Sequence, residues 1–390
     1  MNFDEILDRR NTGSMKWDIA PGPVDPGRHI IPLSVADMEF RSPKGIRDAL
    51  AELAEEGIWG YTGPRPEYYA ALDRWFSLRH GFPINKDWVV PAIGVVQAVF
   101  SAVRAFSEEG GKVLIQTPVY YPFYRAVEEN GRTLLTNPLV IREGRYEIDF
   151  EDLEAKMKEA DIFILCSPHN PVSRVWTEEE IGRMAKLAAE HEVFVISDEI
   201  HSDFSFVEPH TVFTKQARHY GSRHLLALSA SKTFSLAGLG VSSIIIEDPS
   251  DRELFKKRIR LDGVHTHSTF GFAAAEAAYT RCDDWYEAML DYVWENYLAL
   301  KDFTESRMPQ VRLFDLEGTY LAWMDFGPVC SDHEELEQCM VEENLYLDEG
   351  YIFGEAGKGF ERVNLACPRA VLMTALERLE KVYDKLTRDG

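Results

Sequence analysis

The chain has 390 residues, and its 45% hydrophobic and 27% charged residues are typical of a folded globular protein rather than a disordered one. Its 65 acidic and 42 basic residues give a net charge of −23, which disfavours nucleic acids and anionic membranes as partners because both attract basic surfaces. We see no signal peptide or membrane span, and the five dispersed cysteines include no CxxC pair. We therefore expect a cytoplasmic protein without a disulfide scaffold or zinc site.

Short apolar runs alternate with longer amphipathic segments through the first two thirds of the chain. The runs cover residues 112–116, 162–166, 193–197, 225–229 and 243–247. Nearly continuous apolar strands separated by helices are typical of a mostly parallel sheet that helices cover on both faces. The pattern predicts a large α/β domain over residues 43–285.

The last third of the chain has a different pattern. A long helix is predicted from about 283 to 307, strands within 318–326 and 360–366, and a helix over the last twenty residues. This part predicts a smaller α+β domain over residues 286–390, and we expect residues 1–42 to pack with it.

Polar or aromatic side chains follow the first four apolar runs. In chain order these are Tyr120, Asn170, Asp198 and Lys232. Because ligands bind beyond the carboxyl ends of the strands in an open α/β sheet, we expect all four on one rim. Each alone has an ordinary interpretation: core packing for Tyr120, a turn for Asn170, a helix cap or ion pair for Asp198 and an exposed loop for Lys232. Their combination in this order is far more specific.

This constellation resembles the pyridoxal-phosphate (PLP) enzymes of the aspartate aminotransferase fold, fold type I, in the class I and II aminotransferase family. The resemblance rests on Ser229-Ala-Ser-Lys-Thr-Phe234, on Ser197-Asp-Glu-Ile-His201 and on Asn170-Pro171. Within that family, the motifs at 8–18, 35–40, 317–323 and 359–369 resemble the MalY/PatB-like cystathionine β-lyase subgroup.

The resemblance implies a role for each residue of the rim. Lys232 would form the Schiff base with PLP and then act as the general base at the substrate Cα. Asp198 would keep the pyridinium nitrogen protonated, Asn170 and His201 would serve the phenolic oxygen, and Tyr120 would stack on the ring.

The resemblance also implies how the phosphate is held. Backbone N–H groups of Val95 and Val96 would lie at a helix N-terminus, and Ser229 and Ser231 would add hydroxyl groups. Tyr61 would reach the phosphate from the neighbouring subunit, which implies a homodimer with the site at the subunit interface.

An arginine is needed for the carboxylate of the amino-acid substrate, because a guanidinium can bind it through two parallel hydrogen bonds. Arg362 matches the family's carboxylate-binding arginine, and Arg369 is the alternative. Asp37 is expected in a loop at the entrance to the site.

The chain departs from the family at three positions. Gly240 stands where many relatives have an arginine eight residues after the lysine, so the phosphate needs other donors. Ser173 replaces the glycine of the usual Asn-Pro-x-Gly turn, which would strain the backbone if φ is positive there. Glu349 replaces a proline before Gly350 and puts the shape of that loop in question.

These features favour a PLP-dependent carbon–sulfur β-lyase that acts on cystathionine, cysteine or related S-conjugates and releases pyruvate, ammonia and a thiol. The alternative is a PLP-dependent aminotransferase with a keto-acid acceptor, because both reactions need the same residues up to the loss of the Cα proton. A regulator that only binds ligands is a third hypothesis, but it would not need a Schiff-base lysine. No metal is expected, since no nearby Cys or acidic residue completes a plausible ligand set with His265 and His267.

Overall fold

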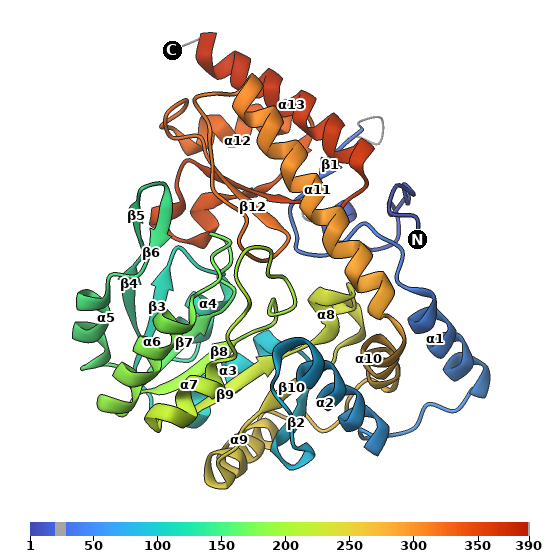
Figure 1. Cartoon of the computed structure of the whole chain (residues 1–390), viewed down its shortest axis with the longest axis vertical. Coiled ribbons are helices and arrows are strands. Elements are labelled where there is room, and N and C mark those ends of the chain that lie inside the picture. The colour runs from blue at the N-terminus through green and yellow to red at the C-terminus, as the bar shows by residue number, and fades with distance from the viewer. Residues whose placement is uncertain (20–28, 389–390) are drawn as a thin grey trace.

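The computed structural model describes residues 1–19 and 29–388. Figure 1 shows a central sheet with helices around it, and above it a smaller layer of strands and helices formed by the orange and red C-terminal part of the chain. The architecture is the predicted one: a mostly parallel sheet flanked by helices, together with a smaller α+β layer.

The central sheet has seven strands in the order β2-β10-β9-β8-β7-β3-β4. Strands β4, β3, β7, β8 and β9 are parallel to one another, whereas β10 is antiparallel to both of its neighbours. Their bounds are Val89–Ala92 (β2), Lys112–Thr117 (β3), Thr133–Pro138 (β4), Ile162–Cys166 (β7), Phe194–Asp198 (β8), His224–Leu228 (β9) and Ser242–Ile245 (β10). The five predicted apolar runs are thus confirmed as strands.

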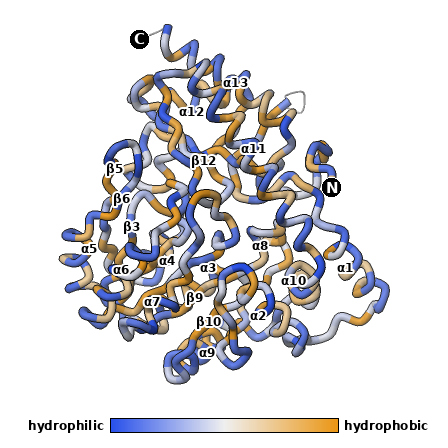
Figure 2. The backbone as a smooth tube through the Cα atoms, viewed as in Figure 1, coloured by the Kyte–Doolittle hydropathy of each residue, from blue (hydrophilic) through white to orange (hydrophobic). Residues whose placement is uncertain are grey.

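Helices cover both faces of this sheet, which explains why its strands are apolar on both sides. In β7, Ile162 and Ile164 belong to the core under α3, α4 and α9, whereas Phe163 and Leu165 belong to the core on the opposite face. That opposite face carries α2, α5, α6, α7 and α10. The hydrophobic segments of Figure 2 accordingly run through the strands and the inward sides of these helices.

The helices around the sheet have these bounds: Lys44–Glu56 (α1), Pro66–His80 (α2), Val95–Phe106 (α3), Pro122–Glu128 (α4), Phe150–Met157 (α5), Glu178–Glu190 (α6), Phe213–Tyr220 (α7), Ala230–Thr233 (α8), Pro249–Leu261 (α9) and Thr269–Arg281 (α10). A hairpin of β5 (Val140–Arg142) and β6 (Arg145–Glu147) lies at one edge. Helix α8 follows β9 directly, so its side chains lie at the carboxyl edge of the sheet.

The C-terminal layer is an antiparallel sheet in the order β11-β12-β15-β14 with three helices. Its elements are α11 (Asp283–Arg307), β11 (Arg312–Leu313), β12 (Leu321–Asp325), α12 (His333–Glu342), β13 (Leu345–Tyr346), β14 (Asp348–Glu349), β15 (Phe360–Asn364) and α13 (Arg369–Arg388). β1 (Ile31–Pro32) pairs with β13 in parallel. The predicted strands and helices of this part are confirmed, while the exact domain limits stay a prediction.

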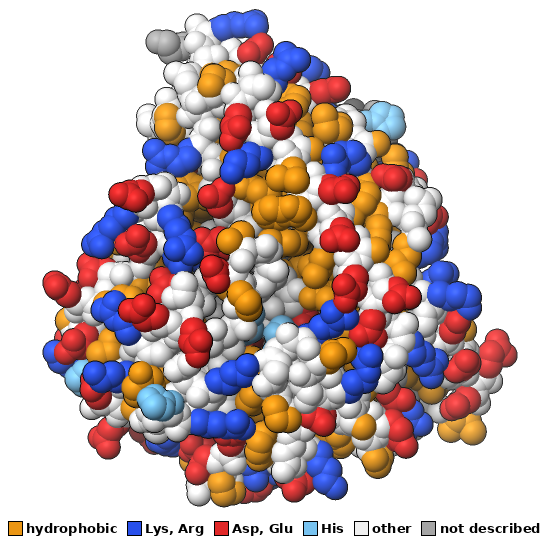
Figure 3. Space-filling model, viewed as in Figure 1, with side chains coloured by type: hydrophobic (Ala, Val, Ile, Leu, Met, Phe, Trp, Pro, Cys, Tyr) orange, Lys and Arg blue, Asp and Glu red, His pale blue; other side chains and the backbone are white. Residues whose placement is uncertain are grey.

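Charged side chains of both signs are interspersed over the face seen in Figure 3. None of the helices in residues 1–19 and 29–388 combines the length and the apolar character needed to cross a membrane. The five cysteines are all buried as free thiols.

Candidate active site

A cavity of about 240 Å³ opens at the carboxyl edge of the central sheet, between that sheet and the C-terminal layer. It is lined by Val35, Ala36, Ile93, Gly94, Val95, Val96, Tyr120, Tyr121, Cys166, Asn170, Asp198, Ile200, His201, Ser231, Lys232, Ala237, Val241, Asp348 and Arg362. The loops after β3, β7, β8 and β9 therefore meet here, as the parallel strand order predicts.

Lys232 lies in the one-turn helix α8 with its amine inside the cavity. The amine donates a hydrogen bond of 2.7 Å to the carbonyl oxygen of Ala36. Burial, reinforced by the positive charge of Arg362, lowers the pKa of this amine to about 8. An amine with that pKa has a far larger free-base fraction near neutral pH than an ordinary lysine, which suits a general base.

Asp198 is the last residue of β8 and is 4% exposed. Burial raises the pKa of its carboxyl group to about 7, although the N–H of Ile200 and the charge of Lys232 both favour the carboxylate. A cation placed next to Asp198 would therefore be stabilised strongly, because it would offset the loss of hydration that raises this pKa.

His201 and Tyr120 form part of the cavity wall, and both side chains are uncharged. Burial, reinforced by the charges of Lys232 and Arg362, holds the pKa of His201 well below its usual value. The buried Nδ1 of His201 has no hydrogen-bond partner among the described residues, as expected for a group that needs a ligand. Burial also raises the pKa of the Tyr120 phenol, so it stays protonated.

Arg362 enters the cavity from β15 and is 3% exposed. Its Nη1 donates to Oδ1 of Asn170 at 2.8 Å, its Nη2 forms an ion pair with Asp348, and its guanidinium lies over the ring of Phe353. Because Oδ1 of Asn170 accepts from Arg362, the amide nitrogen of Asn170 is the group that remains to donate to a ligand.

Helix α3 begins at the cavity with Gly94 as its N-cap. The first N–H groups of a helix have no partner within it, so those of Val95 and Val96 are available to an anion. Ser231 lines the same wall and carries a hydroxyl group. Gly240 has φ 59°, which favours glycine over the arginine of many relatives.

Three candidates from the sequence do not lie in this cavity. The hydroxyl of Ser229 donates to the carbonyl of Val241 and caps α8 by accepting from the N–H of Ser231, so its one hydrogen is already used within the protein, and its predicted role at the phosphate stays a prediction. Tyr61 is 96% exposed on the outside of the molecule. Arg369 lies at the start of α13, where its Nε donates to Asn296 at 2.6 Å.

Three contributors were missed by the sequence analysis: the carbonyl of Ala36, the carboxylate of Asp348 and the hydroxyl of Tyr320, which donates to Ala36 at 2.8 Å. A backbone carbonyl carries no sequence signal. Asp348 could have been suspected only from its place near the Gly350 turn.

The structure also answers two questions raised by the departures. Ser173 has φ 61°, so this turn does need the left-handed conformation, and its hydroxyl offsets part of the cost by donating to the carbonyl of Leu321. The turn at Gly350 keeps its glycine, since a Cβ there would lie 2.0 Å from the carbonyl oxygen of Gly357.

Taken together, the cavity fits PLP. It offers a buried amine, an acid suited to a cationic ring nitrogen, an unpartnered imidazole nitrogen and a helix N-terminus for a phosphate. No group of three or more His, Cys, Asp or Glu side chains within the described residues is arranged to hold a metal ion.

Comparisons with known proteins agree with this geometry. A family model described as aminotransferase class I and II matches residues 28–379. The cystathionine β-lyase PatB of Bacillus subtilis is 38% identical over 384 residues, which cover 97% of this chain and 99% of that protein. The protein MalY of Escherichia coli is 34% identical over 380 residues, 95% of this chain and 96% of MalY.

A solved structure is similar over the whole chain. The crystal structure of cystalysin from Treponema denticola, which contains a PLP cofactor, matches with a TM-score of 0.95 and 39% identity. The match covers 99% of each chain.

Proposed function

The chain belongs to the class I and II aminotransferase family, and from this premise we propose that it is a PLP-dependent carbon–sulfur β-lyase. It is an enzyme, and PLP is its cofactor. Its substrates are cystathionine, cysteine or related S-conjugates, supported by the similarity to PatB over nearly the full chain. The observation in the cavity that supports this chemistry best is the buried Lys232 amine, whose pKa is lowered to about 8 and which shares the cavity with the guanidinium of Arg362.

The bound cofactor supplies an electron sink for the electrons of the Cα–H bond. Lys232 would hold the cofactor, and its free amine would accept the Cα proton of the substrate. Asp198 would hold the proton on the ring nitrogen, while Arg362 would bind the substrate carboxylate. The β-sulfur leaves as a thiolate and takes up a proton, and hydrolysis of the remaining three-carbon unit yields pyruvate and ammonia.

The remaining groups bind and orient. The amide nitrogen of Asn170 and the ring of His201 are suited to the phenolic oxygen, and Tyr120 to the ring face. The N–H groups of Val95 and Val96, with the hydroxyl of Ser231, are suited to the phosphate.

A product assay tests the proposal. The holoenzyme is given L-cystathionine without any keto acid, and pyruvate, ammonia and free thiol are measured. Equal amounts of the three products over many turnovers are expected. A single half-reaction that resumes only when a keto acid is added would identify the aminotransferase instead.

We also propose a homodimer in which Tyr61 completes the site of the partner. Three large side chains of the same loop support it: Ile58, Trp59 and Tyr61 are 82%, 58% and 96% exposed. Such a patch is typical of an interface. Mixed dimers of Lys232→Ala and Tyr61→Ala chains then contain one intact site and should regain activity, whereas neither variant alone should be active. Failure of the mixture to regain activity would contradict the shared site.

A cytoplasmic location is proposed because all five cysteines are free thiols.

A further inference from the structure

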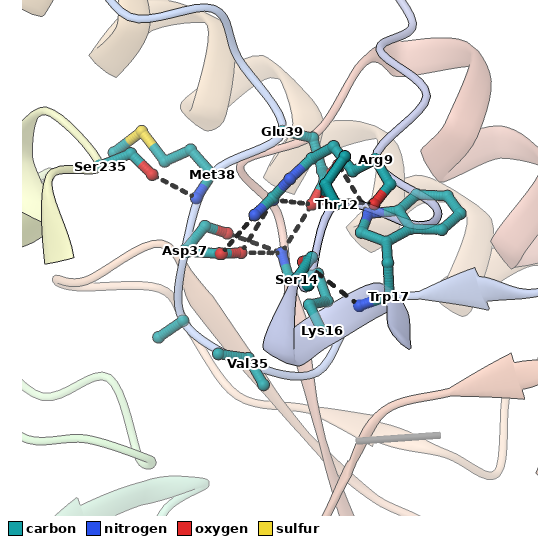
Figure 4. Close-up of polar contacts among 12 residues, drawn as sticks. Arg9, Thr12, Ser14, Lys16, Trp17, Val35, Asp37, Met38, Glu39 and Ser235 are labelled. Atoms are coloured by element: carbon teal, nitrogen blue, oxygen red, sulfur yellow. Dashed lines mark hydrogen bonds and ion pairs between the residues drawn. The ribbon is translucent and has the colours of Figure 1, made fainter. Parts of the chain in front are cut away.

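Lys16 is buried completely, with 0% of its side chain exposed. A buried ammonium group is unfavourable unless its charge and its three N–H donors are matched. Here the ammonium lies 2.8 Å from Oδ1 of Asp37 and 3.1 Å from Oε1 of Glu39, and it donates to the carbonyl oxygen of Asp37 at 2.7 Å. Lys16 therefore ties together the side chain and the backbone of residue 37 (Figure 4).

Arg9 completes this group of charges. Its guanidinium lies 2.9 Å from Oδ2 of Asp37 and 2.8 Å from Oε1 of Glu39, and the indole of Trp17 donates to Oε2 of Glu39 at 3.0 Å. Burial raises the pKa of Asp37, but the charges of Lys16 and Arg9 outweigh it and hold that pKa below the usual value. Two basic and two acidic side chains thus form one closed cluster of ion pairs.

The cluster holds a short backbone segment, residues 35–38, against the active site. Nδ2 of Asn364 donates to the carbonyl oxygens of Val35 and Asp37 at 2.9 and 2.7 Å, and the N–H of Met38 donates to Oγ of Ser235 at 2.9 Å. Figure 4 shows Ser235 beside Met38 on one side of this segment, and Lys16 and Arg9 beside Asp37 on the other.

Between these fixed points lies Ala36, whose carbonyl oxygen lines the site. This oxygen accepts a hydrogen bond of 2.7 Å from the amine of Lys232 and one of 2.8 Å from the hydroxyl of Tyr320. A free lysine side chain has several rotatable bonds, so an acceptor in a fixed place determines where its amine rests.

We propose that Lys16 is a positioning residue for the reaction: by holding residues 35–38 through Asp37 and Glu39, it keeps the Ala36 carbonyl where it receives the Lys232 amine once substrate has freed it. The inference rests on the proposed function of Lys232. It assigns to the N-terminal segment a part in proton transfer, without contact between Lys16 and substrate.

The charge of Lys16 adds a second, measurable consequence. The ionisable groups around the Lys232 amine are Asp198, His201, Tyr320, Arg362, Asp37 and Lys16. Lys16 and Arg362 disfavour a proton on Lys232, whereas Asp37 and Asp198 favour it. Replacing Lys16 by a neutral residue removes one opposing charge and leaves Asp37 less neutralised, so both effects favour the protonated amine.

The test uses the holoenzyme of Lys16→Met, with Lys16→Arg as the conservative variant and Lys44→Met as the matched control. Lys44 is 79% exposed and pairs only with Asp48 among the described residues, so its replacement should leave kinetics and spectra unchanged. For Lys16→Met, we expect kcat at pH 7 to fall about tenfold with a smaller change in KM, because the free base is misplaced. Lys16→Arg should recover part of this loss.

Two pH profiles separate positioning from simple destabilisation. The acid limb of kcat and the pH midpoint of the visible absorbance of the cofactor bound to Lys232 should both rise by about one pH unit in Lys16→Met. A lower melting temperature with an unchanged midpoint and acid limb would overturn the proposal. If Lys16→Met does not fold, Lys16→Met/Glu39→Gln keeps the charge balance of the cluster, and both midpoints should still rise, by less than in Lys16→Met because a carboxylate is lost as well.

The outcome is distinguishable from failure of the proposed function. Wild-type holoenzyme that makes no pyruvate from any cysteine S-conjugate would refute the lyase, but the absorbance midpoint would still report on Lys16. Wild-type turnover together with an unshifted Lys16→Met midpoint would refute only the role of Lys16.

Discussion

Replacement of Arg362 by methionine tests the binding of the substrate carboxylate most directly. Arg362 is buried in the cavity wall, and its guanidinium is oriented by Asn170 at 2.8 Å, by Asp348 and by the ring of Phe353. These contacts leave a planar, fixed cation at the site. Methionine keeps much of the volume but removes the charge and every donor.

The size of the effect follows from the hydrogen bonds that are lost. A hydrogen bond to a charged group contributes about 1.5–3 kcal/mol, so a bidentate contact contributes about 3–6 kcal/mol. At about 1.4 kcal/mol for each factor of ten, kcat/KM for L-cystathionine should fall by about 10²–10⁴. Arg362→Lys keeps the charge but loses the planar pair of N–H donors, so kcat/KM should fall by about 10–100-fold.

The assay is steady-state pyruvate release by the holoenzyme at saturating PLP. Most of the loss should be in KM, because the carboxylate is bound both before and during the reaction. A decrease in kcat at neutral pH should accompany it, since Arg362 helps to lower the pKa of Lys232.

Arg369→Met is the matched control, because Arg369 donates to Asn296 and does not line the cavity. It should lower thermal stability and leave kcat/KM near the wild-type value. The reasoning is refuted if Arg362→Met stays within about threefold of wild type, or if Arg369→Met shows the large increase in KM.

Three further predictions concern the same cavity and its supporting turn. Lys232→Ala should abolish turnover and the visible absorbance of the bound cofactor while far-UV circular dichroism is unchanged; turnover at the wild-type rate would contradict the assignment. In the apoprotein, burial raises the pKa of Asp198 to about 7, whereas its value is 3.8 in the unfolded chain. Between these two values the folded state binds one proton more than the unfolded state. This carboxyl group therefore destabilises the fold increasingly as pH rises from 4 to 7. Asp198→Asn should therefore gain stability relative to wild type between pH 5 and pH 8, by about 4 kcal/mol at most in urea unfolding, and a difference independent of pH would contradict the shift. Ser173→Ala should lower the free energy of unfolding by about 1–2 kcal/mol because it loses the bond to Leu321 and keeps φ at 61°, whereas Ser173→Gly should change it by less than about 1 kcal/mol; equal losses would show that φ carries no cost.

Five of the seven strands of the central sheet were predictable because each of them carries a complete local signal, whereas β2 and β4 were not predicted. A strand buried on both faces needs apolar residues at every position, and Ile162–Cys166 satisfies this without reference to the rest of the chain. Helix α11 was predictable for the same reason, since its pattern extends over 25 residues. The order of the strands, and the reversed direction of β10, carry no such local signal.

The residues of the rim were predictable from the order of strands and motifs, although each was ambiguous alone. Lys232, Asp198, Asn170 and Tyr120 follow parallel strands, and parallel strands end at one edge. Ser229 was predicted as a phosphate ligand, and in the structure its hydroxyl is the N-cap of the one-turn helix α8. A cap and a ligand need the same residue type, so the sequence could not separate them.

The sequence by itself determined the fold class, the family and the residue types that meet at the cavity, because these depend on local periodicity and on short motifs. Only the tertiary structure decided that Arg362 is paired with Asp348, that Arg369 is outside the site, and that buried Lys16 holds the backbone which receives the Lys232 amine. These contacts join β15 to β14 and the N-terminal segment to α8. A backbone carbonyl is the same in every residue, and a buried lysine has the same letter as an exposed one, so only their surroundings in space distinguish them.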